Sequence, residues 1–109
     1  MSETNSVPTI RYDIFIAGDL AQAKQACREF VFARGLCVTV EPVDFIYTGG
    51  EEAGVRVGLI NYPRFPTDEA ALSATAANLA EFLRMRLCQH SFSIAGPRET
   101  QWVSYRDRS

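Results

Sequence analysis

Three side chains of this sequence are of types that could move protons in a reaction: His90, Asp13 and Tyr47. Imidazole, carboxyl and phenol groups serve enzymes as general acids and bases. His90 is the only histidine, and Cys88 lies close enough in the sequence to raise the possibility of a Cys–His nucleophile pair. The two residues fall on different predicted elements, so we do not expect their side chains to point together. His90, Asp13 and Tyr47 are therefore the candidate catalytic residues, and no motif fixes a reaction for them.

The other acidic and glycine-rich segments match no catalytic motif. Glu51–Glu52 falls in a predicted hairpin tip, where a solvated carboxylate is poorly placed for acid–base work. Asp44, like Asp13, interrupts an apolar run, so we expect both carboxylates on the open side of a sheet. The Gly49–Gly50 pair precedes a strand and is not followed by Gly-Lys-Ser/Thr, which argues against a phosphate-binding loop.

Aromatic and arginine side chains give the best indication of a binding surface. Tyr, Trp and Arg often dominate the energy of an interface. The candidate binding residues are Tyr47, Arg56, Tyr62, Arg64, Phe65 and Trp102. Such a sheet face could also stack RNA bases, but the predicted strand Val55–Asn61 lacks the two central aromatics of RNA-recognition sheets. A net charge of −2 further argues against nucleic acid, whose binding depends on neutralising phosphates.

The three cysteines, Cys27, Cys37 and Cys88, are an odd number without a CxxC pair. A structural zinc site needs about four Cys or His ligands at short spacings, so we expect no metal, and nothing indicates a cofactor. Cys27 and Cys88 fall on or beside apolar helix faces, which predicts buried reduced thiols and fits a reducing cytoplasm.

The apolar periodicity changes along the chain in the order β-α-β-β-α-β, with a further strand at the end. The expected strands are Tyr12–Ala17, Leu36–Thr48, Val55–Asn61, Ser91–Ala95 and Thr100–Tyr105, the expected helices are Leu20–Arg34 and Asp68–Cys88, and Gly49–Gly54 is the expected turn. Asp19 is the predicted N-cap of the first helix and Thr67 that of the second. Pro42 cannot donate a hydrogen bond to a ladder, so its strand is expected at a sheet edge.

This element order resembles the ferredoxin-like superfold over roughly residues 10–95. The resemblance implies an α+β sandwich, in which two helices cover one face of an antiparallel sheet. We expect residues 1–9 to form a loose tail and residues 10–106 a single domain, because 109 residues with 47% hydrophobic content suit one core. The resemblance carries no family motif, so no catalytic residue follows from it.

One sheet face would stay uncovered in such a fold, and a large apolar patch on a soluble protein is usually covered. We therefore expect a non-enzymatic binding module that forms a homodimer through this face and binds a protein or a small molecule. A small dimeric enzyme of isomerase or monooxygenase type, with a pocket between sheet and helices, is the first alternative. A structural subunit of a larger assembly, such as a phage-encoded one, is the second. No signal peptide and no run of about 18 apolar residues is present, so we expect a cytoplasmic protein away from membranes.

Overall fold

The computed structural model describes residues 2–106 and contains five strands and two helices. In chain order these are β1 (Arg11–Ala17), α1 (Leu20–Phe32), β2 (Thr39–Tyr47), β3 (Gly50–Ile60), α2 (Glu69–Arg86), β4 (Ser91–Ala95) and β5 (Thr100–Ser104). Neither helix of the described residues combines the length and hydropathy needed to cross a membrane.

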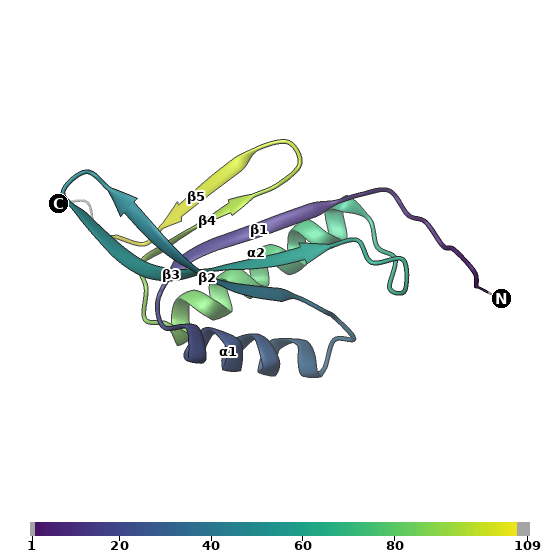
Figure 1. The fold of residues 1–109 in the computed structure, drawn as a ribbon, viewed down its shortest axis with the longest axis horizontal. Coiled ribbons are helices and arrows are strands. Elements are labelled where there is room, and N and C mark those ends of the chain that lie inside the picture. The colour runs from purple at the N-terminus through teal and green to yellow at the C-terminus, as the bar shows by residue number, and fades with distance from the viewer. Residues whose placement is uncertain (1, 107–109) are drawn as a thin grey trace.

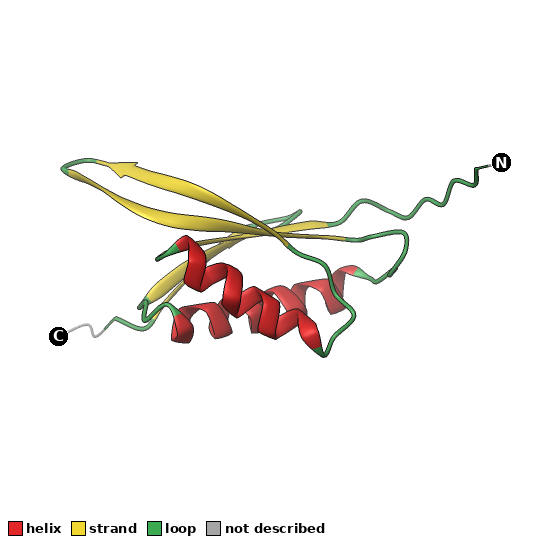
Figure 2. Ribbon diagram, turned by 60° about the horizontal axis from the view of Figure 1, so that its bottom comes forward, coloured by secondary structure: helices red, strands yellow, loops and turns green. Residues whose placement is uncertain are grey.

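The strands form one sheet in the order β2-β3-β1-β4-β5, and every neighbouring pair is antiparallel. β3 lies between β1 and β2, and β1 lies between β3 and β4, so each strand–helix–strand unit is split by a strand of the other. Both helices lie on the same face of the sheet (Figures 1 and 2). The predicted α+β class is confirmed, and so is the additional strand at the C-terminal end.

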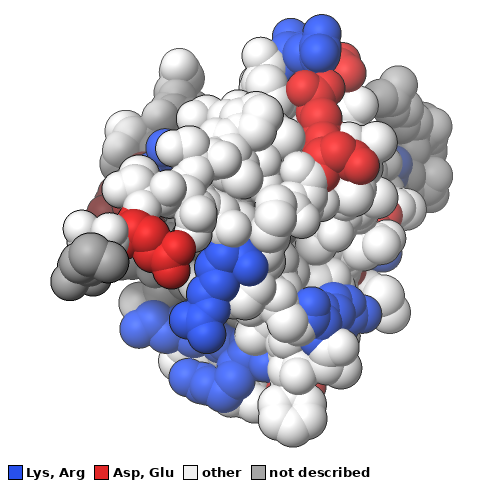
Figure 3. Space-filling model, turned by 90° about the vertical axis from the view of Figure 1, so that its right-hand side faces the viewer, with Lys and Arg blue, Asp and Glu red and all other residues white. Residues whose placement is uncertain are grey.

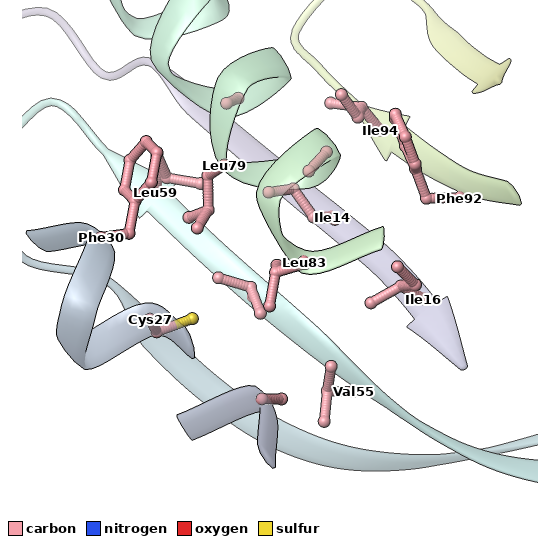
Figure 4. Close-up of a cluster of buried hydrophobic side chains, with 14 of the residues drawn as sticks. Ile14, Ile16, Cys27, Phe30, Val55, Leu59, Leu79, Leu83, Phe92 and Ile94 are labelled. Atoms are coloured by element: carbon pink, nitrogen blue, oxygen red, sulfur yellow. The ribbon is translucent and has the colours of Figure 1, made fainter. Parts of the chain in front are cut away.

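The core lies between the sheet and the two helices. Alternation along β1 places Tyr12, Ile14 and Ile16 on the helix side, where all three are buried. Leu79 and Leu83 of α2 are fully buried against them. Side chains from α1, α2, β1, β3 and β4 converge there (Figure 4). Burying one such leucine contributes roughly 1.5–3 kcal/mol, so this layer holds the helices to the sheet.

The two helix starts were predicted with different success. Asp19 caps α1 as predicted, because its carboxylate accepts the backbone N–H of Gln22 at 2.9 Å. The prediction that Thr67 caps α2 is wrong, since the Asp68 carboxylate accepts the backbone N–H of Ala71 at 2.8 Å. The backbone N–H of Thr67 instead donates to the side chain of buried Asn61 at 2.9 Å, which holds the connector between β3 and α2 (residues 61–68) against the start of the helix.

The β2–β3 hairpin is tighter than predicted. Tyr47 pairs with Gly50, so the loop contains only two residues, and Gly49 takes a φ of 87° there. The expected turn over Gly49–Gly54 is wrong because the segment after Gly49 continues β3. The edge position expected from Pro42 is confirmed, since β2 is the outermost strand on its side.

The burial of the cysteines differs from the prediction at one position. Cys27 is buried, and this burial raises the pKa of its thiol to about 11. Cys88 is exposed, so its predicted burial is wrong. Helix α2 ends at Arg86, and Cys88 follows with a φ of 56°, a left-handed conformation outside the helix.

Candidate functional site

One row of residues runs across the uncovered face of the sheet. The pairing register aligns Glu41, Arg56, Phe15, Ser93 and Trp102 on successive strands from β2 to β5. Arg56 and Trp102, both predicted as binding residues, therefore share this face. Three strand spacings of about 4.8 Å separate them, or about 14 Å.

The Arg56 end of the row is a network of charges. Asp13 accepts the Nε–H of Arg11 at 3.0 Å on one carboxylate oxygen and that of Arg56 at 3.1 Å on the other. Arg56 also lies 3.3 Å from the Glu41 carboxylate. Only 15% of the Asp13 side chain is exposed. Since both of its oxygens hold arginines, Asp13 fixes their positions rather than facing a ligand.

The Trp102 end of the row is a pocket, here called the open-face pocket, with a volume of about 190 Å³. It is lined by Phe15, Phe45, Trp102, Glu52, Ser93 and Arg106, among others. Aromatic rings offer flat surfaces to a heterocycle, a carboxylate binds hydroxyl groups or a cation, and a guanidinium binds a carboxylate. These groups suit a small polar ligand with an aromatic ring system.

Phe45 reaches this pocket because of a glycine on the neighbouring strand. A Cβ at Gly54 would lie 2.3 Å from Cε2 of Phe45 and 2.5 Å from the carbonyl oxygen of Ile16. The ring of Phe45 therefore lies across the bare backbone of β3. Glu52 is the direct pairing partner of Phe45 and lines the same pocket.

Arg106 is positioned by the residue before it. The Tyr105 hydroxyl donates to the carboxylate of Glu81 on α2, which lowers the pKa of Glu81 and raises the pKa of Tyr105. The guanidinium of Arg84 lies 3.9 Å above the Tyr105 ring and bonds Glu81 at 2.9 Å. These contacts hold the end of β5 to α2 and determine where Arg106 leaves the sheet.

A second pocket of about 270 Å³, the helix-side pocket, lies between the start of α2 and the loop that joins β4 to β5. Tyr12, Glu69, Ser73 and Arg98 are among its lining residues. Glu69 and Arg98 pair at 2.8 Å, which raises the pKa of Arg98, so these charges largely neutralise each other. Tyr12, the one aromatic ring in its lining, is 9% exposed. The open-face pocket is therefore better suited to a flat ligand, although the helix-side pocket is larger.

The predicted binding residues of the connector form a separate group. The rings of Tyr62 and Phe65 lie 6.4 Å apart, and the guanidinium of Arg64 lies 5.8 Å from the Phe65 ring. A hydrogen bond between Tyr62 and Cys37 raises the pKa of Tyr62. None of these residues lines the open-face pocket, so the structure divides the predicted binding set into two.

The candidate catalytic residues are not brought together. His90 is exposed at the start of β4, and Tyr47 is 55% exposed at the far end of β2. Neither lines the pocket that Trp102 borders. Asp44 was expected to share a face with Asp13, but the register places it on the opposite side of β2.

Of the predicted binding residues Trp102 alone lines the open-face pocket, and sequence reasoning missed the charged residues of its described lining, Glu52 and Arg106. Glu52 was assigned to a hairpin tip, and only the true length of the hairpin would have placed it on β3. Arg106 lies just beyond β5, where no pattern predicts the direction of a side chain.

Comparison with known proteins adds a fold relationship. No family model and no curated protein matches the chain. A solved structure of a phage SAM lyase in complex with S-methyl-5'-thioadenosine matches with a TM-score of 0.70 and 13% identity, over 95% of both chains. A phage SAM lyase in the apo state matches with a TM-score of 0.64 and 13% identity, over 92% of both chains.

The likeness at this identity shows a shared fold. It also contradicts the prediction of a non-enzymatic binding module, because both of these matched structures are of an enzyme. The predicted alternative of a small enzyme agrees better with these neighbours. The predicted homodimer stays a prediction.

Proposed function

We propose that this protein is an enzyme that cleaves S-adenosylmethionine (SAM) and releases S-methyl-5'-thioadenosine. The observation that carries the proposal is the match, over 95% of both chains, to a SAM lyase in complex with that thioether. The open-face pocket supports it independently, because its side chains suit the parts of such a nucleoside.

The proposed binding mode assigns one role to each side of the pocket. Trp102 and Phe45 stack on the adenine ring, a contact that is typically worth about 1–3 kcal/mol per base. Glu52 accepts hydrogen bonds from the ribose hydroxyl groups or faces the positive sulfonium. Arg106 pairs with the carboxylate of the amino-acid part. At about 190 Å³ the pocket holds only part of SAM, so the remainder lies along the uncovered face.

The chemistry needs little from the protein. The bond between the sulfonium sulfur and Cγ of the amino-acid part breaks, and both electrons go to sulfur, which leaves as a neutral thioether. No acid is needed to protonate this leaving group. Cγ loses this bonding electron pair and forms a new bond in one of two ways. The substrate's own carboxylate forms a lactone with it, or a Cβ–H bond supplies the electrons for a double bond while a base accepts the proton.

The two routes make different demands on Glu52. Lactone formation moves no proton and cancels the carboxylate and sulfonium charges against each other, which a site that excludes water favours. Elimination needs a base, and Glu52 is the carboxylate among the described residues that line the pocket. A proposed site without a Cys–His or paired-acid motif is therefore consistent with this reaction.

The test is to incubate the purified protein with SAM and to measure S-methyl-5'-thioadenosine and the second product by chromatography. We expect the thioether to form and Trp102→Ala to weaken its binding by about 10- to 100-fold. Ser73→Phe, which fills the helix-side pocket, serves as the matched control and is expected to leave turnover unchanged. Loss of activity with Ser73→Phe but not with Trp102→Ala would move the site to the helix-side pocket. No cleavage together with no binding of the thioether would contradict the proposal.

A further inference from the structure

A groove of about 470 Å³ lies on the helix side of the sheet, between α1 and the segment that leads into β2. Its apolar floor is formed by Val31 of α1 together with Leu36, Val38 and Val40. The last three alternate along an extended run, so they point to the same side and are half-buried against α1. The groove therefore presents apolar surface that α1 covers only in part.

Two positively charged side chains border this apolar floor. Lys24 and Arg28 lie one turn apart on α1 and both line the groove. Neither forms an ion pair with any described residue, whereas Arg86 and Arg98 each bond a glutamate. In the end-on view of Figure 3, the Lys and Arg side chains visible on this face gather mainly in its lower half, the side on which α1 lies. The chain as a whole carries −2, so this local positive charge is not a general excess.

The same groove follows an open edge of the sheet. Within the described part of the chain β2 is an edge strand that pairs with β3 alone, and this pairing begins at Thr39. Backbone groups on its outer side are therefore free to bind another extended chain. Pro42 has no N–H to offer, so the usable stretch lies before it, along Leu36–Val40.

We infer that this groove, defined by Lys24, Arg28, Val31, Leu36, Val38 and Val40, binds an extended acidic segment of a partner protein. The segment adds as a strand along Leu36–Val40, places apolar side chains on the floor, and directs carboxylates to Lys24 and Arg28. A fatty acid would fit the floor and the charges but would leave the strand edge unused, so the peptide accounts for more of the surface. The inference does not depend on the proposed lyase activity.

The test uses two short, terminally blocked peptides and NMR of the full chain. In the extended first peptide, Val and Glu alternate along one face of the strand, and every residue on the opposite face is Thr. The second peptide has the same sequence with Lys in place of each Glu. We expect the Glu peptide to shift the amide signals of residues 36–41 and to bind at least about tenfold more tightly than the Lys peptide, with a difference that shrinks as salt rises.

Matched charge variants separate the groove from a general charge effect. Arg28→Gln is expected to weaken binding of the Glu peptide several-fold, while Arg98→Gln, which removes an exposed arginine at the helix-side pocket, leaves it unchanged. Equal binding of both peptides, no shifts along residues 36–41, or an equal loss in the two variants would overturn the inference. Shifts of the floor residues by decanoate, with no response to the Glu peptide, would assign the groove to an apolar anion instead.

Discussion

Replacing Gly54 by alanine tests how the open-face pocket is built. The added Cβ would lie 2.3 Å from the Phe45 ring and 2.5 Å from the Ile16 carbonyl oxygen, and the latter belongs to a central strand that cannot easily yield. Overpacking of this kind costs about 1–3 kcal/mol. Loss of a glycine from the unfolded chain returns about 0.4–1 kcal/mol. The net destabilisation is then about 1–2 kcal/mol, or roughly 5–15 °C in Tm for a domain of this size.

The assay is thermal unfolding followed by circular dichroism, combined with titration of S-methyl-5'-thioadenosine. Gly54→Ala should lower Tm and also weaken binding, because Phe45 must leave its place. Phe45→Ala together with Gly54→Ala removes the ring contact but keeps the carbonyl contact. The double variant should therefore be more stable than the sum of the two single changes predicts, by at least about 0.5 kcal/mol. A Gly54→Ala protein that unfolds within about 2 °C of the original and binds the thioether equally well would refute the account.

The remaining predictions concern the core, acid stability, thiol reactivity and self-association. Leu79→Ala, at a fully buried position, should cost about 2–5 kcal/mol in denaturant unfolding, and a cost below about 1 kcal/mol would contradict the packing described. Because Arg86 lowers the pKa of Glu29 from 4.5 to about 2, this ion pair stabilises the fold fully above about pH 4.5 and loses its effect as the pH falls toward 2. Arg86→Met should therefore flatten the acid unfolding profile in this window. Iodoacetamide should label Cys37 in the native protein and Cys27 only after unfolding, as peptide mass spectrometry would show. The predicted homodimer should appear in sedimentation velocity as a species of twice the chain mass, and a single-chain species at all concentrations would exclude it.

Sequence patterns predicted the sheet and helices because each pattern reports on burial. Tyr12, Ile14 and Ile16 alternate along β1, the leucines of α2 recur at helical spacing, and the structure buries both sets in the core. The hairpin was misread because Gly50–Ala53 contains residues typical of turns, and cross-strand pairing overrode that local preference.

The candidate site was only partly predictable for a related reason. Trp102 and Arg56 were identified from residue type, but their alignment in one row depends on the register of five strands. Register is set by pairing across the whole sheet, which a single strand does not reveal. Glu52 could be recognised as part of the pocket only after the hairpin length fixed its face.

The β2–β3 hairpin extends past the helix layer, so both of its surfaces meet water near the loop (Figure 2). Ile46, on the side the helices would cover, is 72% exposed. This arm carries Phe45 and Glu52, while Trp102 stands on the opposite edge of the same sheet. One side of the open-face pocket therefore lies on a hairpin that the helices do not support. Bending of this hairpin would change the distance between Phe45 and Trp102, and with it the width of the pocket entrance.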